Sequence, residues 1–188
     1  MALKTLAIIK PDVVSHPVIL KMVGEVVMSS FKITQACRIR LNREQASQLY
    51  NCHIGKFFYN RLVMHMTSGP LIALELQMTD DSDPILKWRS TLGPSKLFAN
   101  FMDHKNIPIE QKCLRQRFSV SDTRNCAHGS DSSSEVEREM SVFKPFMKPV
   151  IDPIKIFELP EGLKPSNHED DVDVELLTFR ERTNIAFN

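Results

Sequence analysis

The sequence has 188 residues, of which 42% are hydrophobic, and its formal net charge at pH 7 is +1. The hydrophobic share is too high for a disordered chain, and the length is typical of one domain with an appendage. The near-neutral charge gives no bulk attraction to nucleic acid or to an anionic membrane, and no apolar run approaches the ~20 residues that span a bilayer.

The N-terminal region predicts a strand, a helix and a second strand. Residues 6–9 are apolar and predict a short buried strand, which ends at the Lys10-Pro11-Asp12 turn. After Pro17, apolar residues recur at helical spacing as far as Val27, which predicts an amphipathic helix with proline in its first turn. Apolar residues of one parity between positions 33 and 41 then predict a half-buried strand.

The middle of the chain predicts two helices, a strand and a further helix. The segment Asn42-x-x-Gln45 is a capping box and predicts a helix start. A second helical stretch covers residues 62–66, and residues 71–76 form another apolar strand. Asp83-Pro84 is typical of a helix N-terminus, with aspartate as the cap and proline in the first position.

The C-terminal half predicts one more strand and one more helix. A long connection from residue 93 to about 114 precedes a predicted strand at residues 117–120, and Ser132-x-x-Glu135 is a second capping box. The resulting order, β-α-β-α-α-β-α-β-α, fits an α/β sandwich whose helices cover an antiparallel or mixed sheet. Residues 151–188 contain three prolines and an acidic run, so we expect a tail that packs only in part.

The densest polar cluster runs from Thr123 to Ser132, between the last predicted strand and the last predicted helix. Its His128 can act as a nucleophile, because neutral imidazole has a nitrogen lone pair near pH 7. Glu139, one helical turn past Glu135, is placed to fix the ring, and the helix N-terminus favours an anion nearby. A single loop histidine is equally compatible with a structural role, so His128 alone does not decide the function.

Three cations are candidates for binding an anion. Lys10 ends a buried strand, Arg89 lies in a capped helix, and Arg115 precedes the last predicted strand. Phosphoryl transfer requires cations around the moving phosphate, although Arg89 and Arg115 alone are compatible with solvated surface charges. Lys10 is the exception, because a Lys-Pro-Asp turn directly after an apolar strand is less ordinary. The sequence contains neither a G-x-x-x-x-G-K-[S/T] segment nor the protein-kinase motifs, so phosphate chemistry would proceed without a P-loop.

Two motifs taken together resemble the nucleoside diphosphate kinase family. They are Ile8-Ile9-Lys10-Pro11-Asp12 and Asn125-Cys126-Ala127-His128-Gly129-Ser130-Asp131-Ser132, the second of which contains the family signature N-x-x-H-G-S-D. Ser68-Gly69-Pro70 falls in the expected place between them, and the resemblance covers residues 4–145. The Phe57-Phe58-Tyr59 run and the tail are most similar to the divergent sixth-type members, which are associated with mitochondria in animals.

The resemblance implies a fold and a mechanism. The fold is a ferredoxin-like α/β sandwich with a mainly antiparallel four-stranded sheet covered by helices, in a domain of residues 1–150, followed by a proline-containing, acidic and partly disordered tail at residues 151–188. The mechanism is ping-pong: His128 would attack the γ-phosphate of a nucleoside triphosphate, become phosphohistidine and pass the phosphate to a nucleoside diphosphate. ATP would serve as the phosphate donor, and Mg²⁺ would be carried on the phosphates of the nucleotide without a dedicated protein site.

The resemblance also implies roles at matching positions. Besides His128, the catalytic residues are Glu139, which fixes the ring, Tyr50, which helps to orient the phosphates and the histidine, and Lys10. The residues implied in nucleotide binding are Lys10 for phosphate and ribose, Phe58 for stacking on the base, Arg89, Ser95 and Arg115 for phosphate oxygens, and Asn125 for the sugar. Ordinary core packing is the alternative for Phe58 and Tyr50.

The sequence departs from the common family pattern at several positions. Gln116 stands where glycine is usual, Ser95 replaces threonine and keeps its hydroxyl, and His16 replaces an arginine. The stretch from Ser95 to Arg115 is longer than in the common members, where it helps to bind nucleotide and to build a hexamer. The hexamer is therefore an open question for this chain.

Two functional hypotheses follow. The first is an active nucleoside diphosphate kinase, and the second is a nucleotide-binding interaction module with weak or no kinase activity that acts through a protein partner. Nucleoside tri- and diphosphates are the expected ligands, with a homo-oligomer or a protein partner as further options and without nucleic acid or a membrane span. The four cysteines have no metal-ligand spacing and are expected to be reduced thiols. A cytoplasmic location is the default because no signal or presequence is visible, and the mitochondrion is the alternative.

Overall fold

The computed structural model describes residues 3–96, 98 and 107–158. Part of the long connection after residue 93 and the acidic run of the expected tail lie outside the described residues. None of the helices in these ranges is long and apolar enough to cross a membrane.

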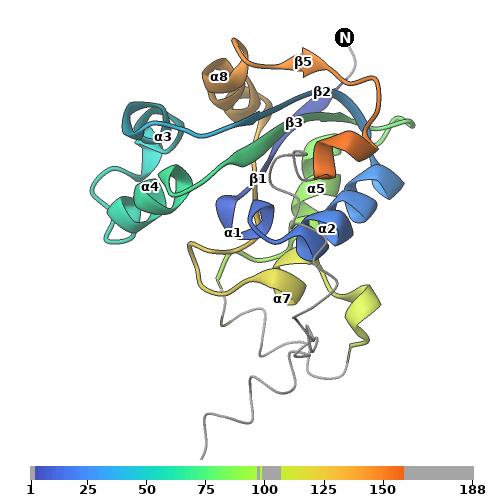
Figure 1. Ribbon diagram of the computed structural model, residues 1–188, viewed down its shortest axis with the longest axis horizontal. Helices are drawn as coiled ribbons and strands as arrows, with labels where there is room; N and C mark the ends of the chain where they lie inside the picture. Colours follow the sequence, from blue (N-terminus) through green and yellow to red (C-terminus); the bar gives the residue numbers. More distant parts are fainter. Residues whose placement is uncertain (1–2, 97, 99–106, 159–188) are drawn as a thin grey trace, which may run out of the picture. The chain divides into compact units, whose positions relative to one another are not determined.

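The described residues form a five-stranded sheet with the strand order β4-β1-β3-β2-β5, and each pair of neighbours is antiparallel (Figure 1). The strands are β1 (Lys4–Ile9), β2 (Lys32–Ile39), β3 (Leu71–Gln77), β4 (Ala127–Gly129) and β5 (Lys148–Pro149). The ferredoxin-like α/β class is confirmed, and the sheet has five strands where four were predicted, because the two residues of β5 add to the outer edge of β2.

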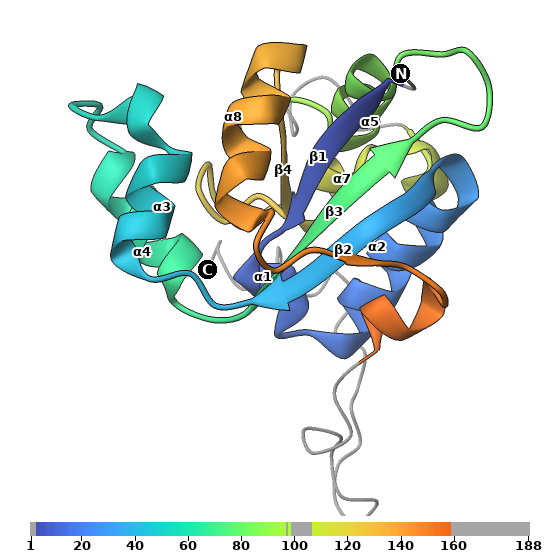
Figure 2. The same ribbon diagram turned by 90° about the horizontal axis from the view of Figure 1, so that it is seen from above.

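Helices cover both faces of this sheet (Figure 2). They are α1 (Pro11–Val14), α2 (Pro17–Ser30), α3 (Arg43–Leu49), α4 (Tyr59–Thr67), α5 (Pro84–Leu92), α7 (Leu114–Phe118) and α8 (Ser133–Phe143), with 3₁₀ turns η1 (Asn51–His53), η2 (Ile109–Gln111) and η3 (Ile154–Phe157). Figures 1 and 2 place α3, α4 and α8 on one side of the strands and α2 and α5 on the other.

Alternation along β1 divides the core between these two faces. Ala7 and Ile9 belong to a cluster with the buried residues of α2 and α5, whereas Leu6 and Ile8 belong to one with those of α3, α4 and α8. All four side chains are fully buried. A strand that is buried on both faces reads as a continuous apolar run, which is the pattern that predicted β1.

The predicted helix starts are confirmed, although one of the two predicted capping boxes is only half formed. Asn42 and Gln45 form a reciprocal capping box at α3, and the Asp83 carboxylate accepts from the first backbone amides of α5. Ser132 caps α8 by accepting from the amide of Glu135 at 3.3 Å. The reciprocal half of that second box is absent because the Glu135 side chain instead pairs with Arg138.

The predicted strand at residues 117–120 is wrong. Residues 114–118 form helix α7, because the Gln116 side chain turns back to accept from the amide of Cys113 at 3.0 Å and so caps the helix start. Arg115 therefore lies in α7 and does not precede a strand. Besides β3, the strand that pairs with β1 is Ala127–Gly129, which is too short and too poor in β-branched residues to be recognised from its pattern.

The segment after β5 packs against α2. The Phe157 ring contacts the backbone of Gly24 so closely that a Cβ at position 24 would lie 2.5 Å from the ring. Arg38 donates to the carbonyls of Ile156 at 2.9 Å and of Glu158 at 2.7 Å, which fixes η3 against the outer strand. The expected domain boundary at residue 150 stays a prediction, and residues 159–188 of the expected tail lie outside the described residues.

Candidate active site

His128 lies in the middle of edge strand β4, opposite Ile8 of β1, and not in a loop as its sequence position had indicated. The Trp88 indole on α5 donates to the carbonyl of His128 at 3.0 Å. Gly129 allows this approach, since a Cβ there would meet the indole at 2.5 Å. The backbone that carries His128 is therefore held by pairing on one side and by α5 on the other.

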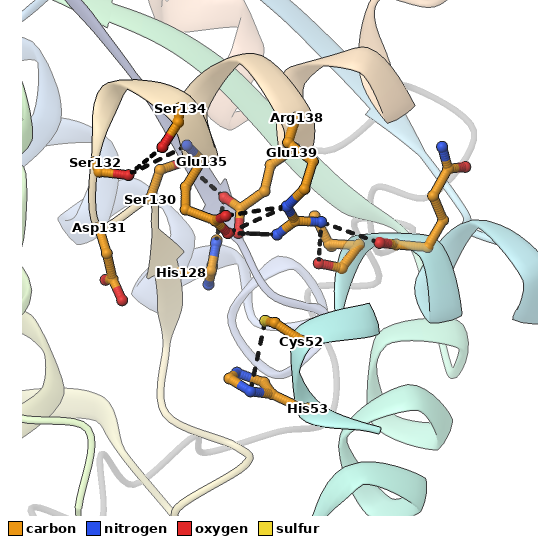
Figure 3. A network of polar contacts seen from close by, with 12 residues as sticks. Cys52, His53, His128, Ser130, Asp131, Ser132, Ser134, Glu135, Arg138 and Glu139 are labelled. Carbon is orange, nitrogen blue, oxygen red and sulfur yellow. Dashed lines mark hydrogen bonds and ion pairs between the residues drawn. The ribbon is translucent and has the colours of Figure 1, made fainter. Parts of the chain in front are cut away.

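The His128 ring is oriented by a buried carboxylate, as Figure 3 shows. Its Nε2 lies 2.8 Å from Oε2 of Glu139, and the Ser130 hydroxyl donates to the same oxygen at 2.6 Å. The Glu139 side chain is 5% exposed and that of His128 is 19% exposed. Burial alone would raise the pKa of Glu139, but the hydrogen bond and charge of His128, the Ser130 hydroxyl and the Arg138 charge together lower it.

An ionised Glu139 decides which ring nitrogen is available. A carboxylate can only accept, so Nε2 of His128 carries the proton of this pair. Within the described part of the chain, Nδ1 of His128 has no hydrogen-bond partner. The lone pair on Nδ1 is therefore free, and the remaining exposure of the ring leaves it open to a ligand.

Tyr50 ends α3 and lies against this histidine. Its ring is 5.6 Å from that of His128 in an edge-to-face arrangement, and the residue is 3% exposed. The core packing of Tyr50 and its place in the site are thus both observed. Its hydroxyl is buried without a partner among the described residues, and burial raises the pKa of that phenol. A buried neutral hydroxyl without a partner is suited to donate to an incoming oxygen.

Two of the predicted cations hold the backbone on either side of His128. Arg115 donates to the carbonyl of Ala127 at 2.9 Å, and Arg89 donates to the carbonyl of Gly129 at 3.5 Å and pairs with Asp131. Arg115 is partly buried and its Nε lacks a partner among the described residues, while the Arg89 side chain is 46% exposed. The structure therefore brings both guanidinium groups to the strand that carries the histidine.

Lys10 is a buried cation, not a solvated surface charge. It is 4% exposed, and its Nζ donates to Oδ1 of Asn125 at 2.5 Å and to the carbonyl of Thr123 at 3.1 Å. Burial and the neighbouring Arg115 lower the pKa of Lys10 to about 8. The Asn125 amide in turn donates to the carbonyl of Ser95 at 3.2 Å, so these predicted residues form one connected group.

Phe58 lies apart from these cations, in a row of rings that starts at the histidine. Tyr50 stacks on His53 at 6.0 Å, and His53 meets the edge of Phe58 at 5.4 Å. Phe58 is half-buried against the core, and Phe57 beside it is 88% exposed. The row therefore connects the histidine, through Tyr50 and His53, to the aromatic ring of Phe58.

Sequence reasoning missed two supporting residues. Asp12 uses one carboxylate oxygen for Nε2 of His65 at 2.8 Å and the other for the amide of Cys126 at 3.1 Å. Cys126 has a positive φ of 74°, which costs a non-glycine residue roughly 1–2 kcal/mol, and the bond from its amide helps to offset that strain. The Lys-Pro-Asp turn was a visible signal for Asp12, but its two partners come from elements distant in the sequence.

The second missed residue is Arg138. It contacts Glu139, Glu135 and the end of α3, and nothing in its sequence context distinguishes it from an exposed helix arginine. Together the described side chains provide a histidine with one fixed and one free nitrogen, a nearby phenol and three cations. Such an arrangement can accept and stabilise a phosphoryl group.

The comparisons with known proteins agree with this geometry. The model of the family described as nucleoside diphosphate kinase matches residues 3–147. Human nucleoside diphosphate kinase 6 is 38% identical over 142 residues, which cover 75% of this chain and 72% of that protein, and the mouse protein of the same name is 39% identical, with 75% and 70% covered.

Two solved structures share the fold. The nucleoside diphosphate kinase of Aquifex aeolicus has a TM-score of 0.64 at 25% identity, covering 76% of this chain and 95% of that chain. The halophilic enzyme of Halobacterium salinarum, solved in complex with CDP, has a TM-score of 0.61 at 25% identity, with 76% and 88% covered. The chain therefore belongs to the nucleoside diphosphate kinase family, in which it is a divergent member similar to nucleoside diphosphate kinase 6.

Proposed function

We propose that this chain transfers the γ-phosphate of a nucleoside triphosphate to a nucleoside diphosphate through a phosphohistidine on His128. The family gives the chain a function of the nucleoside diphosphate kinase type. The observation that carries the finer proposal is the 2.8 Å contact of Nε2 with buried Glu139, which leaves Nδ1 of His128 as the nucleophile.

In the first half-reaction, the Nδ1 lone pair attacks the γ-phosphorus, and the bond from that phosphorus to its bridging oxygen breaks. The electron pair of that bond stays on the departing diphosphate. Because the ring becomes a cation as the N–P bond forms, the Glu139 carboxylate on Nε2 stabilises it, as a buried carboxylate does for a catalytic imidazole. The second half-reaction runs the same step in reverse, with the terminal oxygen of a different diphosphate as the nucleophile.

The nucleotide is bound by the remaining predicted residues. Arg89, Arg115 and Lys10 supply positive charge for the phosphate oxygens, and Tyr50 supplies a hydroxyl without a partner among the described residues. Arg89 must release Asp131 to do so, which its exposure allows. The half-buried ring of Phe58 is suited to stack on a base of any kind, because every base has a π-face.

Mg²⁺ would arrive on the phosphates of the nucleotide. In the described ranges, no group of three or more His, Cys, Asp or Glu side chains is arranged to hold a metal ion. The cations near His128 fit the phosphate oxygens, and the ion would neutralise further charge on those oxygens when the nucleotide is bound.

Labelling tests the proposal. Purified protein is incubated with γ-labelled ATP, and we expect acid-labile, base-stable label on the wild type and none on His128→Ala. Persistence of that label on His128→Ala would exclude the mechanism. Addition of GDP should then move the label to GTP; label that stays on the protein would favour the nucleotide-binding interaction module with weak or no turnover.

A further inference from the structure

Arg138 on α8 links parts of the site that are distant in the sequence (Figure 3). Its guanidinium donates to Oε1 of Glu139 at 3.2 Å. It also donates to the backbone carbonyls of Gln48 at 3.1 Å and of Leu49 at 3.2 Å, ninety and eighty-nine residues earlier in the chain. One side chain therefore contacts both the carboxylate next to the histidine and the end of α3.

The contact with Glu139 completes the surroundings of that carboxylate. Oε2 is occupied by His128 and Ser130, and Oε1 by Arg138. With both oxygens bonded, the plane of the carboxylate is fixed, and with it the ring that Oε2 holds. The guanidinium is suited to this task because its donors form a rigid planar fork.

The contacts with α3 fix the neighbour of His128. The last carbonyls of a helix have no intrahelical donor, and a cation there is favoured by the helix dipole. Gln48 and Leu49 belong to this last turn, and Tyr50 is the next residue. The same guanidinium therefore determines where Tyr50 lies relative to the histidine ring, 5.6 Å away.

Glu135 holds the guanidinium in place. Nε of Arg138 donates to the Glu135 carboxylate at 3.2 Å and Nη2 donates to it at 2.6 Å, across one turn of α8. The Arg138 side chain is 28% exposed and that of Glu135 is 35% exposed, so solvent screens this pair only in part. Each end of the guanidinium has a defined partner, which is uncommon for a helix-surface arginine.

We propose that Arg138 is a positioning residue that holds Glu139 and Tyr50 together against His128. The proposal rests on the function proposed above, because the step it supports is phosphoryl transfer to that ring. Arg138 itself touches no reacting atom in this arrangement.

The test compares Arg138→Gln with Arg138→Lys, with Glu137→Gln as the matched control on the exposed side of the same helix. Rapid-quench labelling with γ-labelled ATP measures the rate of phosphohistidine formation, and thermal unfolding checks the fold. Loss of a partner that orients a metal-bound histidine typically lowers activity about 10–100-fold. By analogy, we expect Arg138→Gln to slow labelling by at least ~10-fold with the KM for ATP unchanged. Glu137→Gln should match the wild type.

The pH profile separates positioning from a merely structural role. The charged or titratable groups around Glu139 are His128 on β4, Arg138 on its own helix, Tyr50 at the end of α3, and His53 in η1. Loss of the Arg138 charge lets Glu139 take up a proton at higher pH, and a neutral Glu139 loses the negative charge that stabilises the ring as it becomes cationic. In the pH profile of the labelling rate, the fall on the acid side should move to higher pH in Arg138→Gln. It should stay in place in Arg138→Lys, because lysine keeps the charge although it cannot contact both Glu139 and the end of α3.

A wild-type labelling rate in Arg138→Gln, or a slower rate with an unmoved acid limb, would overturn the proposal. Nitrogen NMR of the His128 ring makes the two proposals separable, because it detects the hydrogen bond at Nε2 without catalysis. Slow exchange of the Nε2 proton in the wild type and faster exchange in Arg138→Gln supports the role of Arg138 even if no label forms. If the wild type is labelled and the Nε2 proton exchanges equally fast in both proteins, the positioning role of Arg138 is refuted and the proposed function stands.

Discussion

At the scale of single residues, the site depends on how the two nitrogens of His128 differ. Glu139 bonds one of them and is itself held by Ser130 and Arg138, while the other has no hydrogen-bond partner in the described part of the chain. The carboxylate contributes orientation and charge, and it remains ionised at neutral pH because its pKa is lowered. The same logic applies to buried carboxylates that orient catalytic histidines in other enzymes.

Replacement of this carboxylate should therefore reduce the chemical step. Glu139→Gln keeps the shape but loses the charge that stabilises the ring as it becomes cationic. We expect the rate of phosphohistidine formation to fall by about 10²–10⁴-fold in rapid-quench labelling. An unchanged rate would show that the contact at Nε2 has no part in catalysis.

The lowered pKa of Lys10 should make kcat/KM for ATP depend on pH on the alkaline side of neutrality. Its pKa, lowered to about 8 by burial and by Arg115, means that the ammonium is present below pH 8 and lost above it. Binding of phosphate should weaken accordingly, so kcat/KM for ATP should fall as the pH rises through about 8. A profile that stays level up to pH 10 would contradict this role.

The lowered pKa of Lys10 also makes the unfolding free energy depend on pH. Between pH 8 and its ordinary value of 10.5, the unfolded chain binds more protons than the folded one. Stability rises with pH where the unfolded state binds more protons, so the contribution of Lys10 to the unfolding free energy should increase across this window. Denaturant titrations of the wild type and Lys10→Met at several pH values measure it.

Much of the site could be predicted from the sequence, and the reason lies in the local character of its motifs. His128, Asn125 and Lys10 occur in two short segments whose residue types are recognisable on their own. Arg138 and Asp12 could not be found this way, because each acts through partners that only the fold brings near. The sequence shows both residues, but their contacts become visible only in the folded structure.

At the scale of elements, β4 shows where local pattern fails. Three residues that include a glycine and a histidine have weak strand propensity. They pair with β1 where α5 packs on them and where Glu139 of α8 bonds the His128 ring. Residues 117–120 have a better local pattern for a strand than β4 does. However, Gln116 caps the start of α7, so the chain is helical as far as Phe118. The capping box at Asn42 and the helix start at Ser132 were predicted correctly because the residues involved lie within four positions of each other.

Packing of α5 against β4 gives a testable consequence. In Gly129→Ala, the new Cβ would meet the Trp88 ring at 2.5 Å, which displaces the indole from the carbonyl of His128. Overpacking of this kind costs about 1–3 kcal/mol, so denaturant unfolding should show a loss in that range together with slower labelling. Gly69→Ala is the control, because its nearest contact would be an ordinary 3.5 Å to Pro11. Equal stability of both variants would argue against the tight α5–β4 contact.

At the scale of the whole molecule, the compact unit reaches residue 158. Phe157 is 5% exposed and belongs to the core cluster that contains α2. The cue for this packing was absent from the sequence, where prolines and a change of composition after residue 150 indicated a tail. A few apolar residues in such a segment do not reveal which helix they contact.

Two truncations test where the folded unit ends. A chain cut after Glu158 keeps β5 and η3, so its thermal midpoint should stay near that of the full chain. A chain cut after Met147 loses the Phe157 ring, and removal of a buried phenylalanine costs about 3–5 kcal/mol, so its midpoint should fall by several degrees at least. Equal midpoints for the two truncations would favour a boundary near residue 150.

The most direct test of the central claim is the position of the phosphate on the ring of His128. After a brief reaction with ATP, the phosphohistidine is isolated under alkaline conditions, and its two isomers are separated by chromatography. Because Glu139 occupies Nε2, we expect the phosphate to be bonded to Nδ1. Phosphate on Nε2, or on a residue other than His128, would contradict it.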